Sequence, residues 1–571
     1  MVTSSTPTLD EILVAHAFES PSHRFLLRPV HDDVDTPVEG ITYGIFNMHV
    51  SRLARAWSTE KTSSGAPLIQ TRDVVGVFFP SGYTLCVVLF AVLRLGAIPF
   101  CLSPRNSDLA LRHLVQKGKV VAIIAAVDDD LLSKLQNALI HHKEGSDLYV
   151  PTLGVARSEL ADLPIPSESQ SYPPLLPGTI TGDDVAIQQH TSGSTAFPKP
   201  VPLTNKLIIR SLRGGTWWVD DLHDQRDVTL GQPPVFHVGF QMFGLIGGLL
   251  NSVYRGHTFA LPPIPKSDNR GLFPAPQTLR RYASRIGATE FFGVSNSVVG
   301  LARSEGGIDL LKSLKRVLVA GAPMPRENGD WIVEHEVHLV EGVGSTEGGA
   351  LLHSNRPRGD PAWQGMQVCW NVTHHFERFG PPPHTLYELV LHSSELSGNF
   401  PGADPATGHL STHDLFQEWP KPGSGRWRHC GRSHDVLLLS TGQNWNPRPM
   451  ELQIEAFPVI KHAVVFGQAR PALGVLIAPH EDHHPDGRHN KQATIWEAIQ
   501  AVNSVAPHNA RIDRSRVLVL APTGVYLLDG SSPISSDEIK VIPIADKGTP
   551  LRPKTYELFK HEIHYVYNDI V

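Results

Sequence analysis

The sequence contains little cysteine, with only four in 571 residues. They are Cys86, Cys101, Cys369 and Cys430, which lie far apart and form no CxxC pair. This spacing argues against a disulfide framework and against a thiolate zinc site. We therefore expect the protein to work in a reducing compartment, the cytoplasm.

An excess of basic charge is also missing. The chain has 50 Lys and Arg against 56 Asp and Glu, a formal net charge of -6. No cluster of Lys and Arg is dense enough to form the positive face that nucleic-acid binding needs. We expect no nucleic-acid partner.

Long hydrophobic runs are absent as well. The longest, residues 85–93, is far shorter than the ~20 residues that a membrane-spanning helix requires. The apolar stretch 12–18 follows two acidic residues rather than the basic segment that begins a signal peptide. We expect neither a membrane protein nor a secreted one.

Helical and strand-like patterns alternate along most of the chain. The predicted helices cover residues 41–57 and 85–93, and the predicted strands cover 74–79, 97–101, 120–126, 185–189, 317–320 and 337–340. This alternation is typical of an α/β fold with mainly parallel sheets sandwiched by helices. We predict a large N-terminal domain over 1–432 and a small α+β domain over 433–571, with strands at 436–439, 463–466, 474–478 and 516–520.

The most informative stretch is QHTSGSTAFPKP, residues 189–200, directly after a predicted strand. It contains Thr191, Ser192, Gly193, Ser194, Thr195 and Lys199. Backbone N–H groups of such a turn, its hydroxyls and a lysine can converge on phosphate oxygens. The GxxxxGK[ST] spacing of a Walker A loop is not met, and composition alone favours an ordinary surface loop. The order of the motifs further along the chain favours the phosphate-binding loop instead.

Five motifs in sequence resemble those of the adenylate-forming superfamily, which includes acyl-CoA synthetases, luciferases and nonribosomal-peptide adenylation domains. Residues 191–199 resemble its phosphate loop TSGSTGxPK, and residues 344–347, 411–414 and 431–435 are similar to its YGxTE, TGD and GRxDD segments. Residues 545–549 resemble the element that carries the catalytic lysine of the family. The resemblance runs from about residue 41 to 560.

Within the superfamily, the chain looks most like the adenylation domain of fungal carboxylic acid reductases related to nonribosomal peptide synthetases. Residues 103–107, 438–442 and 546–549 carry this likeness. In that group a carrier domain and a reductase domain follow the adenylation domain. This chain ends at Val571, too soon after Lys547 for either, so we expect a carrier, and with it a reductase, in trans or on a part of the protein outside this chain.

The resemblance implies ATP and Mg²⁺ as cofactors and a role for each motif residue. Residues 191–195 and Lys199 would hold the β- and γ-phosphates, Glu347 would bind Mg²⁺, and Thr346 would contact the α-phosphate. Asp414 would bind the ribose hydroxyls with Arg432 nearby, and Lys547 would bring its ammonium between the substrate carboxylate and the α-phosphate. Gly431 and His434 would mark a hinge. Taken singly, Glu347, Asp414 and Lys547 are equally typical of a loop acid, a turn residue and a surface lysine.

His237 provides a clue to the substrate, because related enzymes that activate amino acids usually have an Asp there to pair with the α-ammonium. An unpaired buried ammonium would be costly, so the resemblance implies a carboxylic acid without an α-amino group, aryl rather than long-chain. The expected pocket residues are His237, Phe240, Gly321, Ala322 and Gly344. A core histidine at 237 and a tight turn at 321–325 remain open alternatives.

Two departures from the family concern the nucleotide: Ala196 replaces a glycine, and Val343 stands where a tyrosine usually stacks on adenine. A histidine cluster at residues 480–489 invites a metal hypothesis, but the surrounding prolines and glycine favour a solvated loop. The leading hypothesis is ATP-dependent activation of the acid to an acyl-adenylate, followed by transfer to the phosphopantetheine thiol of a carrier. The alternatives are a free-standing acyl-CoA ligase and a nucleotide-binding or scaffold protein with a decayed site.

Overall fold

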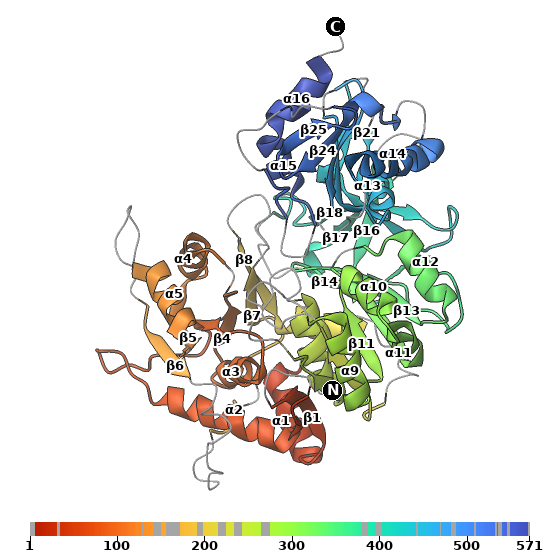
Figure 1. Cartoon of the computed structure of the whole chain (residues 1–571). Helices are drawn as coiled ribbons and strands as arrows, with labels where there is room; N and C mark the ends of the chain where they lie inside the picture. Colours follow the sequence, from red (N-terminus) through yellow and green to blue (C-terminus); the bar gives the residue numbers. More distant parts are fainter. Residues whose placement is uncertain are drawn as a thin grey trace. The chain divides into compact units, whose positions relative to one another are not determined.

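A computed structural model describes residues 6–30, 35–104, 106–127, 129–140, 150–155, 172–176, 178–190, 198–214, 224–232, 242–263, 274–321, 323–379, 386–395, 402–440, 444–468, 470–480, 487–506, 510–530, 534, 540–544 and 549–568. The chain divides into two compact units (Figure 1). The first runs over 1–324, 328–373 and 392–408, and the second over 325–327, 374–391 and 409–571.

The first unit contains two large sheets. The nine-stranded sheet has the order β15 (Gln367–Val368), β14 (Gly349–His353), β13 (Leu339–Ser345), β12 (Arg316–Ala320), β11 (Glu290–Gly293), β9 (Val228–Gly231), β10 (Thr258–Ala260), β1 (Arg24–Pro29) and β2 (Val38–Thr42). The six-stranded sheet has the order β6 (Thr152–Val155), β5 (Val120–Ala126), β3 (Val74–Phe78), β4 (Ile98–Cys101), β7 (Val185–His190) and β8 (Pro200–Thr204). Strands β13 to β1 and β6 to β7 pair in parallel, and antiparallel pairs occur only toward the edges. The predicted α/β class with mainly parallel sheets is confirmed.

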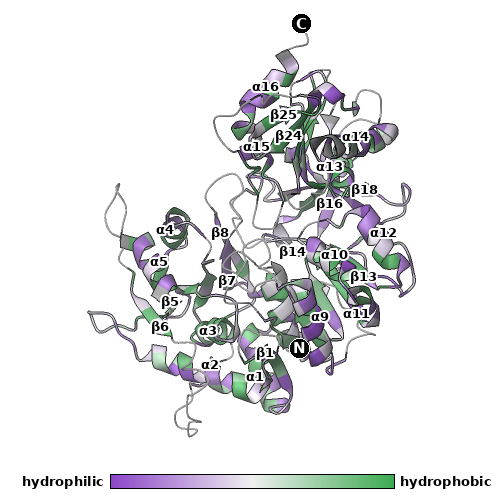
Figure 2. Ribbon diagram, viewed as in Figure 1, coloured by the Kyte–Doolittle hydropathy of each residue, from purple (hydrophilic) through white to green (hydrophobic). Residues whose placement is uncertain are grey.

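Helices cover these sheets. They are α1 (Leu9–Glu19), α2 (Tyr43–Ser58), α3 (Tyr83–Arg94), α4 (Asp108–Lys117), α5 (Asp129–Ile140), α7 (Asn205–Gly214), α8 (Asn251–Arg255), α9 (Pro276–Ile286), α10 (Ser295–Arg303), α11 (Gly307–Ser313) and α12 (Arg326–Glu334), with a π-helix over Met242–Leu250. Leu279 of α9 and Leu301 of α10 pack with Leu230, Phe291 and Val317 of the nine-stranded sheet. Figure 2 shows the central strands as hydrophobic and the helices as mixed, which is the pattern that buries both faces of a parallel sheet.

The second unit is built mainly on antiparallel strands. One sheet contains β16 (His374–Phe379), β17 (Leu386–Leu391), β18 (Leu410–Glu418) and β19 (Trp427–Arg432), and β20 (Leu437–Leu438) pairs with β21 (Asn444–Trp445). Another contains β22 (Ile460–Phe466), β23 (Gly474–Pro479), β24 (Val517–Ala521) and β25 (Gly524–Leu527), with helices α13 (Arg448–Glu455), α14 (Gly487–Val505), α15 (Arg552–Leu558) and α16 (Lys560–Asn568). Strands β23 and β24 form one parallel pair.

Alternation along β22 divides the core of the second unit into two layers. Val465 packs with Ile454 of α13 and Ile499 of α14, whereas Val464 packs with Phe559 and with Val566 of α16. Successive strand residues point to opposite faces, so one strand serves both layers.

The predicted elements agree closely with the observed ones. The predicted strand 120–126 is β5, and the predicted helix 41–57 is α2, which begins at Tyr43 because the Thr42 hydroxyl accepts the Ile45 N–H at 3.3 Å and caps the helix. The predicted strand 337–340 begins later and runs to Ser345 as β13.

The predicted domain boundary after Arg432 stays a prediction. The compact units group residues 409–432 with the C-terminal part, where β19 contacts α13. This contact accounts for the grouping of β19 with the second unit.

The membrane and metal predictions can be compared with the described residues only. In that part of the chain no helix is long and apolar enough to cross a bilayer, and no group of three or more His, Cys, Asp or Glu could hold a metal. Residues 481–486 of the histidine cluster lie outside the described residues, and His489 lies in α14 rather than in a loop. All four cysteines are described and are free thiols.

Candidate functional site

In the first unit, Thr346 and Glu347 lie in the turn that joins β13 to β14. Ser345 pairs with Gly349 across this hairpin, and the Gly348 N–H donates to Ser345 Oγ at 2.9 Å, which closes the turn. Gly344 is required here, because a Cβ at that position would lie 2.6 Å from the Gly349 carbonyl oxygen. The structure places Gly344 at the end of β13 and Thr346 and Glu347 in the turn that follows it.

Gly321 directly follows β12, the strand that pairs with β13. Ala320 at the end of β12 pairs with Gly342 of β13, and Gly321 follows with φ 84°, a left-handed conformation that favours glycine. The Met324 N–H donates to Glu341 Oε1 at 3.0 Å, so a buried carboxylate fixes the segment after Gly321 to β13. The sequence analysis missed Glu341, although a single acid within an apolar strand sequence is a recognisable signal.

The predicted phosphate loop joins two paired strands of the same unit. His190 at the end of β7 pairs with Pro200 at the start of β8, and Lys199 precedes β8 with an exposed side chain. Residues Thr191, Ser192, Gly193, Ser194 and Thr195 lie outside the described residues, as do His237, Phe240, Ala322 and Lys547. Their roles stay predictions.

In the second unit, Asp414 is 5% exposed and lies on β18 opposite Arg432 of β19. Arg432 Nε donates to Asp414 Oδ1 at 3.2 Å, and His429 Nε2 lies 3.4 Å from the same oxygen. Burial raises the pKa of Asp414, but the hydrogen bond from His429 and the charge of Arg432 outweigh it, so the pKa lies below its ordinary value. Asp414 is therefore held as a carboxylate that can accept further donors.

The backbone before Asp414 is irregular. His413 has φ 58°, an uncommon left-handed conformation for a residue other than glycine. His413 Nδ1 lies 3.0 Å from Glu388 Oε1, and Ser433 Oγ donates to the same oxygen at 3.2 Å. The register also shifts between Asp414 and Phe416. These contacts fix the kink that sets the direction of the Asp414 side chain.

The predicted hinge begins at a glycine that the backbone requires. Gly431 has φ 102°, and a Cβ there would lie 3.2 Å from the Asn446 side chain. Ser433–Asp435 form a single 3₁₀ turn that includes position 434. The hinge itself stays a prediction.

The segment that contains position 547 is anchored on both sides. Ile544 and Pro550 form an antiparallel bridge, and the Leu551 N–H donates to the Pro543 carbonyl at 2.8 Å. Arg552, which follows on α15, forms an ion pair with buried Glu451 at 2.7 Å. The described residues on the two sides of this segment are therefore held next to one another.

A divalent cation fits the donor chemistry of the turn in the first unit. The turn has one carboxylate, Glu347, and one hydroxyl, Thr346, and Mg²⁺ is commonly held by one or two carboxylates together with substrate phosphates. In the described part of the chain, Glu347 forms no ion pair.

Comparison with known families identifies the chain. A family model described as AMP-binding enzyme matches residues 16–374. The chain belongs to the AMP-binding enzymes. The model for the C-terminal domain of AMP-binding enzymes also matches, over residues 434–571. These matches confirm the predicted resemblance and the prediction that the chain belongs to an enzyme family.

Curated relatives of this AMP-binding enzyme include fungal reductases. Adenylate-forming reductase Nps10 of Heterobasidion annosum is 28% identical over 569 residues, which cover 94% of this chain and 50% of the relative. A carboxylic acid reductase of Neurospora crassa is 22% identical over 589 residues, which cover 98% of this chain and 50% of the relative. The chain thus spans about half the length of the curated relatives that it matches.

Solved structures share the fold of this AMP-binding enzyme. The A domain of carboxylic acid reductase from Segniliparus rugosus, in complex with AMP and a co-purified carboxylic acid, has a TM-score of 0.72 at 15% identity and covers 100% of this chain and 95% of its own. The anthranilate CoA ligase AuaEII, in complex with anthranoyl-AMP, has a TM-score of 0.71 at 15% identity, with 97% of each chain covered.

Proposed function

We propose that this AMP-binding enzyme activates a carboxylic acid without an α-amino group and transfers it to the phosphopantetheine thiol of a carrier. The observation that carries the proposal is the match of both AMP-binding family models, over 16–374 and 434–571. The turn at Glu347 and the held carboxylate of Asp414 support it, because each has the chemistry that its motif position requires.

The first step is an in-line displacement at the α-phosphorus of ATP. An oxygen of the substrate carboxylate forms a bond to this phosphorus, the bond to the bridging oxygen breaks, and pyrophosphate leaves with that electron pair. Negative charge on the phosphate oxygens must be stabilised in the transition state. In this proposal Lys547 supplies one positive charge, while residues 191–195 and Lys199 hold the β- and γ-phosphates.

The residues of each unit have separate roles in the proposal. Glu347 would bind Mg²⁺, which neutralises phosphate charge when bound, and Thr346 would donate its hydroxyl to the α-phosphate. Asp414 accepts hydrogen bonds from the ribose hydroxyls, and Arg432 keeps its carboxyl group ionised. The Arg432 side chain is 54% exposed and can also approach a ligand.

The substrate pocket is assigned to His237, Phe240, Gly321, Ala322 and Gly344. His237 in place of an aspartate would leave an α-ammonium unpaired, which favours aryl and other amine-free acids. Gly321 follows β12, and Gly344 lies on the adjacent strand β13. The name of the Neurospora crassa relative, a carboxylic acid reductase, supports a carboxylic acid as the substrate class.

In the second step the thiolate sulfur attacks the acyl carbon, a thioester forms and AMP leaves. Because the chain spans about half of its relatives, we propose that the carrier, and with it a reductase, acts in trans or lies outside this chain. The four free cysteines fit a cytoplasmic location.

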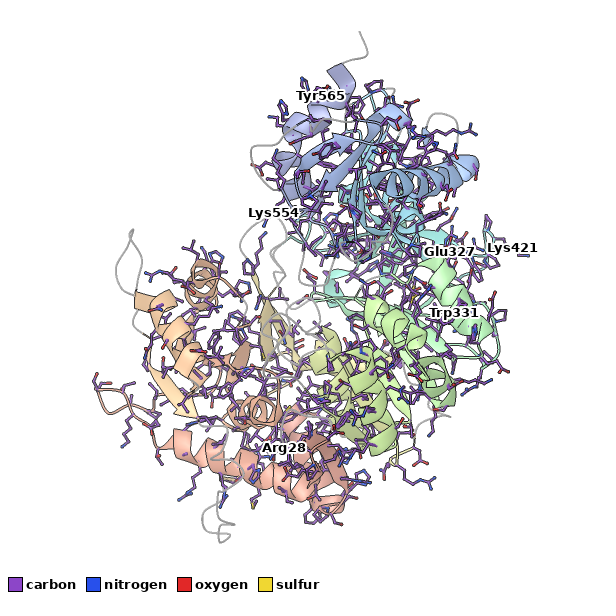
Figure 3. The ribbon with its side chains drawn as sticks, in the orientation of Figure 1. Arg28, Glu327, Trp331, Lys421, Lys554 and Tyr565 are labelled. Atoms are coloured by element: carbon purple, nitrogen blue, oxygen red, sulfur yellow. The ribbon has the colours of Figure 1, made fainter. Side chains whose placement is uncertain are left out.

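The proposal is tested by acid-dependent pyrophosphate release with ATP and Mg²⁺ over benzoic, cinnamic, aliphatic, keto and amino acids. We expect release with an amine-free acid and a loss of about 10²–10³-fold in Lys547→Ala, because one preorganised charge at the phosphate is removed. Lys554→Ala is the matched control, since Lys554 is exposed on α15 (Figure 3). The control should release pyrophosphate at the wild-type rate.

Three results would redirect the proposal. If none of the acids caused pyrophosphate release, the scaffold alternative would be favoured. If pyrophosphate release did not depend on Lys547, the mechanism would be contradicted. Mass spectrometry of the product with CoA, or with a phosphopantetheinylated carrier, distinguishes the two acceptors. Thioester formed with CoA and not with the carrier would identify a free-standing ligase.

A further inference from the structure

Helix α7 contacts the turn that carries Glu347, although the two are far apart in the sequence. Arg210 of α7 donates from Nη2 to the carbonyl oxygen of Gly348, across 138 positions of chain. Gly348 directly follows Glu347 and closes the same turn through its N–H and Ser345 Oγ. The turn is thus closed internally by Ser345 and held from outside by a guanidinium group.

The helix that carries Arg210 is itself fixed at its first turn. Asn205 Nδ2 donates to the Thr181 carbonyl at 3.1 Å, and the Leu207 N–H donates to Thr204 Oγ1 at 3.2 Å. Because β8 runs directly into α7, the helix is fixed to the strand that follows Lys199.

A second anchor lies further along α7. Asn371 Nδ2 donates to the carbonyl of Arg210 itself at 2.9 Å. Gly214 at the end of the helix must be a glycine, since a Cβ there would lie 1.6 Å from Asn371 Oδ1. The helix that carries the guanidinium group is therefore held at its first turn and again at the Arg210 carbonyl. These contacts fix the backbone from which the Arg210 side chain extends to Gly348.

The guanidinium group is kept in an unfavourable environment. Its Nε and Nη1 atoms are out of contact with water, and burial lowers the pKa of Arg210 to about 10. The group remains protonated at neutral pH, so desolvation of a full charge opposes folding at this position. The guanidinium group therefore carries a full positive charge beside Gly348, the residue that follows Glu347.

We propose that Arg210 is a positioning residue that holds the turn 345–348, and with it the Glu347 carboxylate, in the orientation that binds a divalent cation. The inference rests on the proposed function, in which Glu347 is the protein ligand of Mg²⁺. In this proposal Arg210 also links the predicted phosphate loop to the turn 345–348. Strand β8 and helix α7 follow that loop in the chain, and the Arg210 side chain donates to Gly348 in the turn.

The test measures cation binding rather than turnover. Mn²⁺, in place of Mg²⁺, is titrated into the 571-residue chain saturated with α,β-methylene-ATP, which cannot be cleaved at the α–β bridge, and free Mn²⁺ is followed by electron paramagnetic resonance. We expect Arg210→Met to raise the Mn²⁺ dissociation constant about 10-fold. Arg210→Lys should restore most of the affinity, because the ammonium keeps one charged donor near Gly348. A purely structural role would lower the thermal midpoint without moving the Mn²⁺ constant.

Arg213→Met is the matched control on the same helix. Arg213 donates to the Tyr254 hydroxyl at 3.1 Å in an exposed contact, and its loss should leave Mn²⁺ binding unchanged. If Arg210→Met does not fold, Arg210→Gln, which is too short to reach Gly348, takes its place. A folded Met or Gln variant with a Mn²⁺ constant within twofold of wild type overturns the inference, and so does failure of both variants to fold.

The proposed function and the positioning role of Arg210 can be contradicted independently of each other. If the wild-type chain binds α,β-methylene-ATP and Mn²⁺ but releases no pyrophosphate with any acid, the adenylation reaction is wrong and the positioning role of Arg210 can still hold. If the wild-type chain releases pyrophosphate and the Arg210 variants bind Mn²⁺ normally, only the positioning role is wrong.

Discussion

Each of the two units contains one acid that the motifs single out, and the two acids are held in opposite ways. Glu347 lies at a hairpin turn whose backbone is fastened by Ser345 and Arg210, while its own carboxylate forms no ion pair in the described part of the chain. Asp414 is buried, and its carboxylate already accepts from Arg432 and lies beside His429.

This difference matches two kinds of ligand. A cation brings its own positive charge and needs a carboxylate that is not yet neutralised, with a backbone that holds it in place. A pair of ribose hydroxyls brings only neutral donors, so the acid that receives them must be kept ionised by the protein, which His429 and Arg432 do. The comparison predicts that variants of the two acids will differ in their dependence on metal.

Glu347→Gln should have the largest effect. The amide keeps the shape but loses the charge, so we expect pyrophosphate release to fall by about 10²–10³-fold. Because Glu347 makes no described ion pair, the free energy of unfolding should change by no more than about 0.5 kcal/mol. Steady-state rates at saturating ATP and a urea titration measure the two quantities.

The matched control for this variant is Glu334→Gln, an exposed acid at the end of α12. It should leave both the rate and the stability unchanged. If Glu347→Gln weakened nucleotide binding equally with and without Mg²⁺, the cation would not be the ligand of Glu347 and the comparison with Asp414 would no longer hold.

Asp414→Asn should have an intermediate effect of a different kind. We expect AMP affinity to fall by about 10-fold, and to fall equally in the presence and absence of Mg²⁺, because ribose binding does not involve the metal. Calorimetric titration with AMP at both conditions measures this. Affinity within twofold of wild type would show that the ribose is bound elsewhere, and a loss seen only with Mg²⁺ would make the two acids alike.

The sequence predicted the secondary elements well where one pattern governs them. Residues 120–126 form an unbroken apolar run that is typical of a buried strand, and they are β5, in which every residue except Val121 is buried. The predicted start of α2 at residue 41 is two residues too early, because the apolar pattern starts at Ile41 but the helix is capped at Thr42 and begins at Tyr43. Such local competition is decided by a single hydrogen bond.

The geometry around the motif residues could not be predicted in this way. The kink at His413 depends on Glu388, which comes from the neighbouring strand β17. The contact of Arg210 with Gly348 joins residues 138 positions apart. The motif order identifies which residues belong to the site, but partners such as His429 and Arg210 come from strand pairing and helix packing that no local pattern records.

The smallest expected effect concerns the pH dependence of the second unit. The pKa of Asp414 in the folded chain is below its ordinary value, so its stabilising contribution is fully present above that ordinary value and is lost as the pH falls toward the folded value. His429→Gln removes one of the groups that lower this pKa, while burial still raises it. The acid limb of AMP binding, measured by calorimetry, should therefore move upward, by about one pH unit or less.

The same substitution should leave the Mn²⁺ affinity unchanged, because His429 lies on β19 beside Asp414, whereas Glu347 lies in the turn between β13 and β14. If the acid limb of AMP binding shifted while the Mn²⁺ affinity did not, the two acids would be shown to differ: the protein keeps Asp414 ionised, whereas a bound cation would neutralise Glu347. No shift of the acid limb would mean that Arg432 alone keeps Asp414 ionised, since the 3.4 Å contact of His429 is the longer of the two. A downward shift would contradict the sign of the argument, because removal of a donor cannot favour the ionised carboxylate.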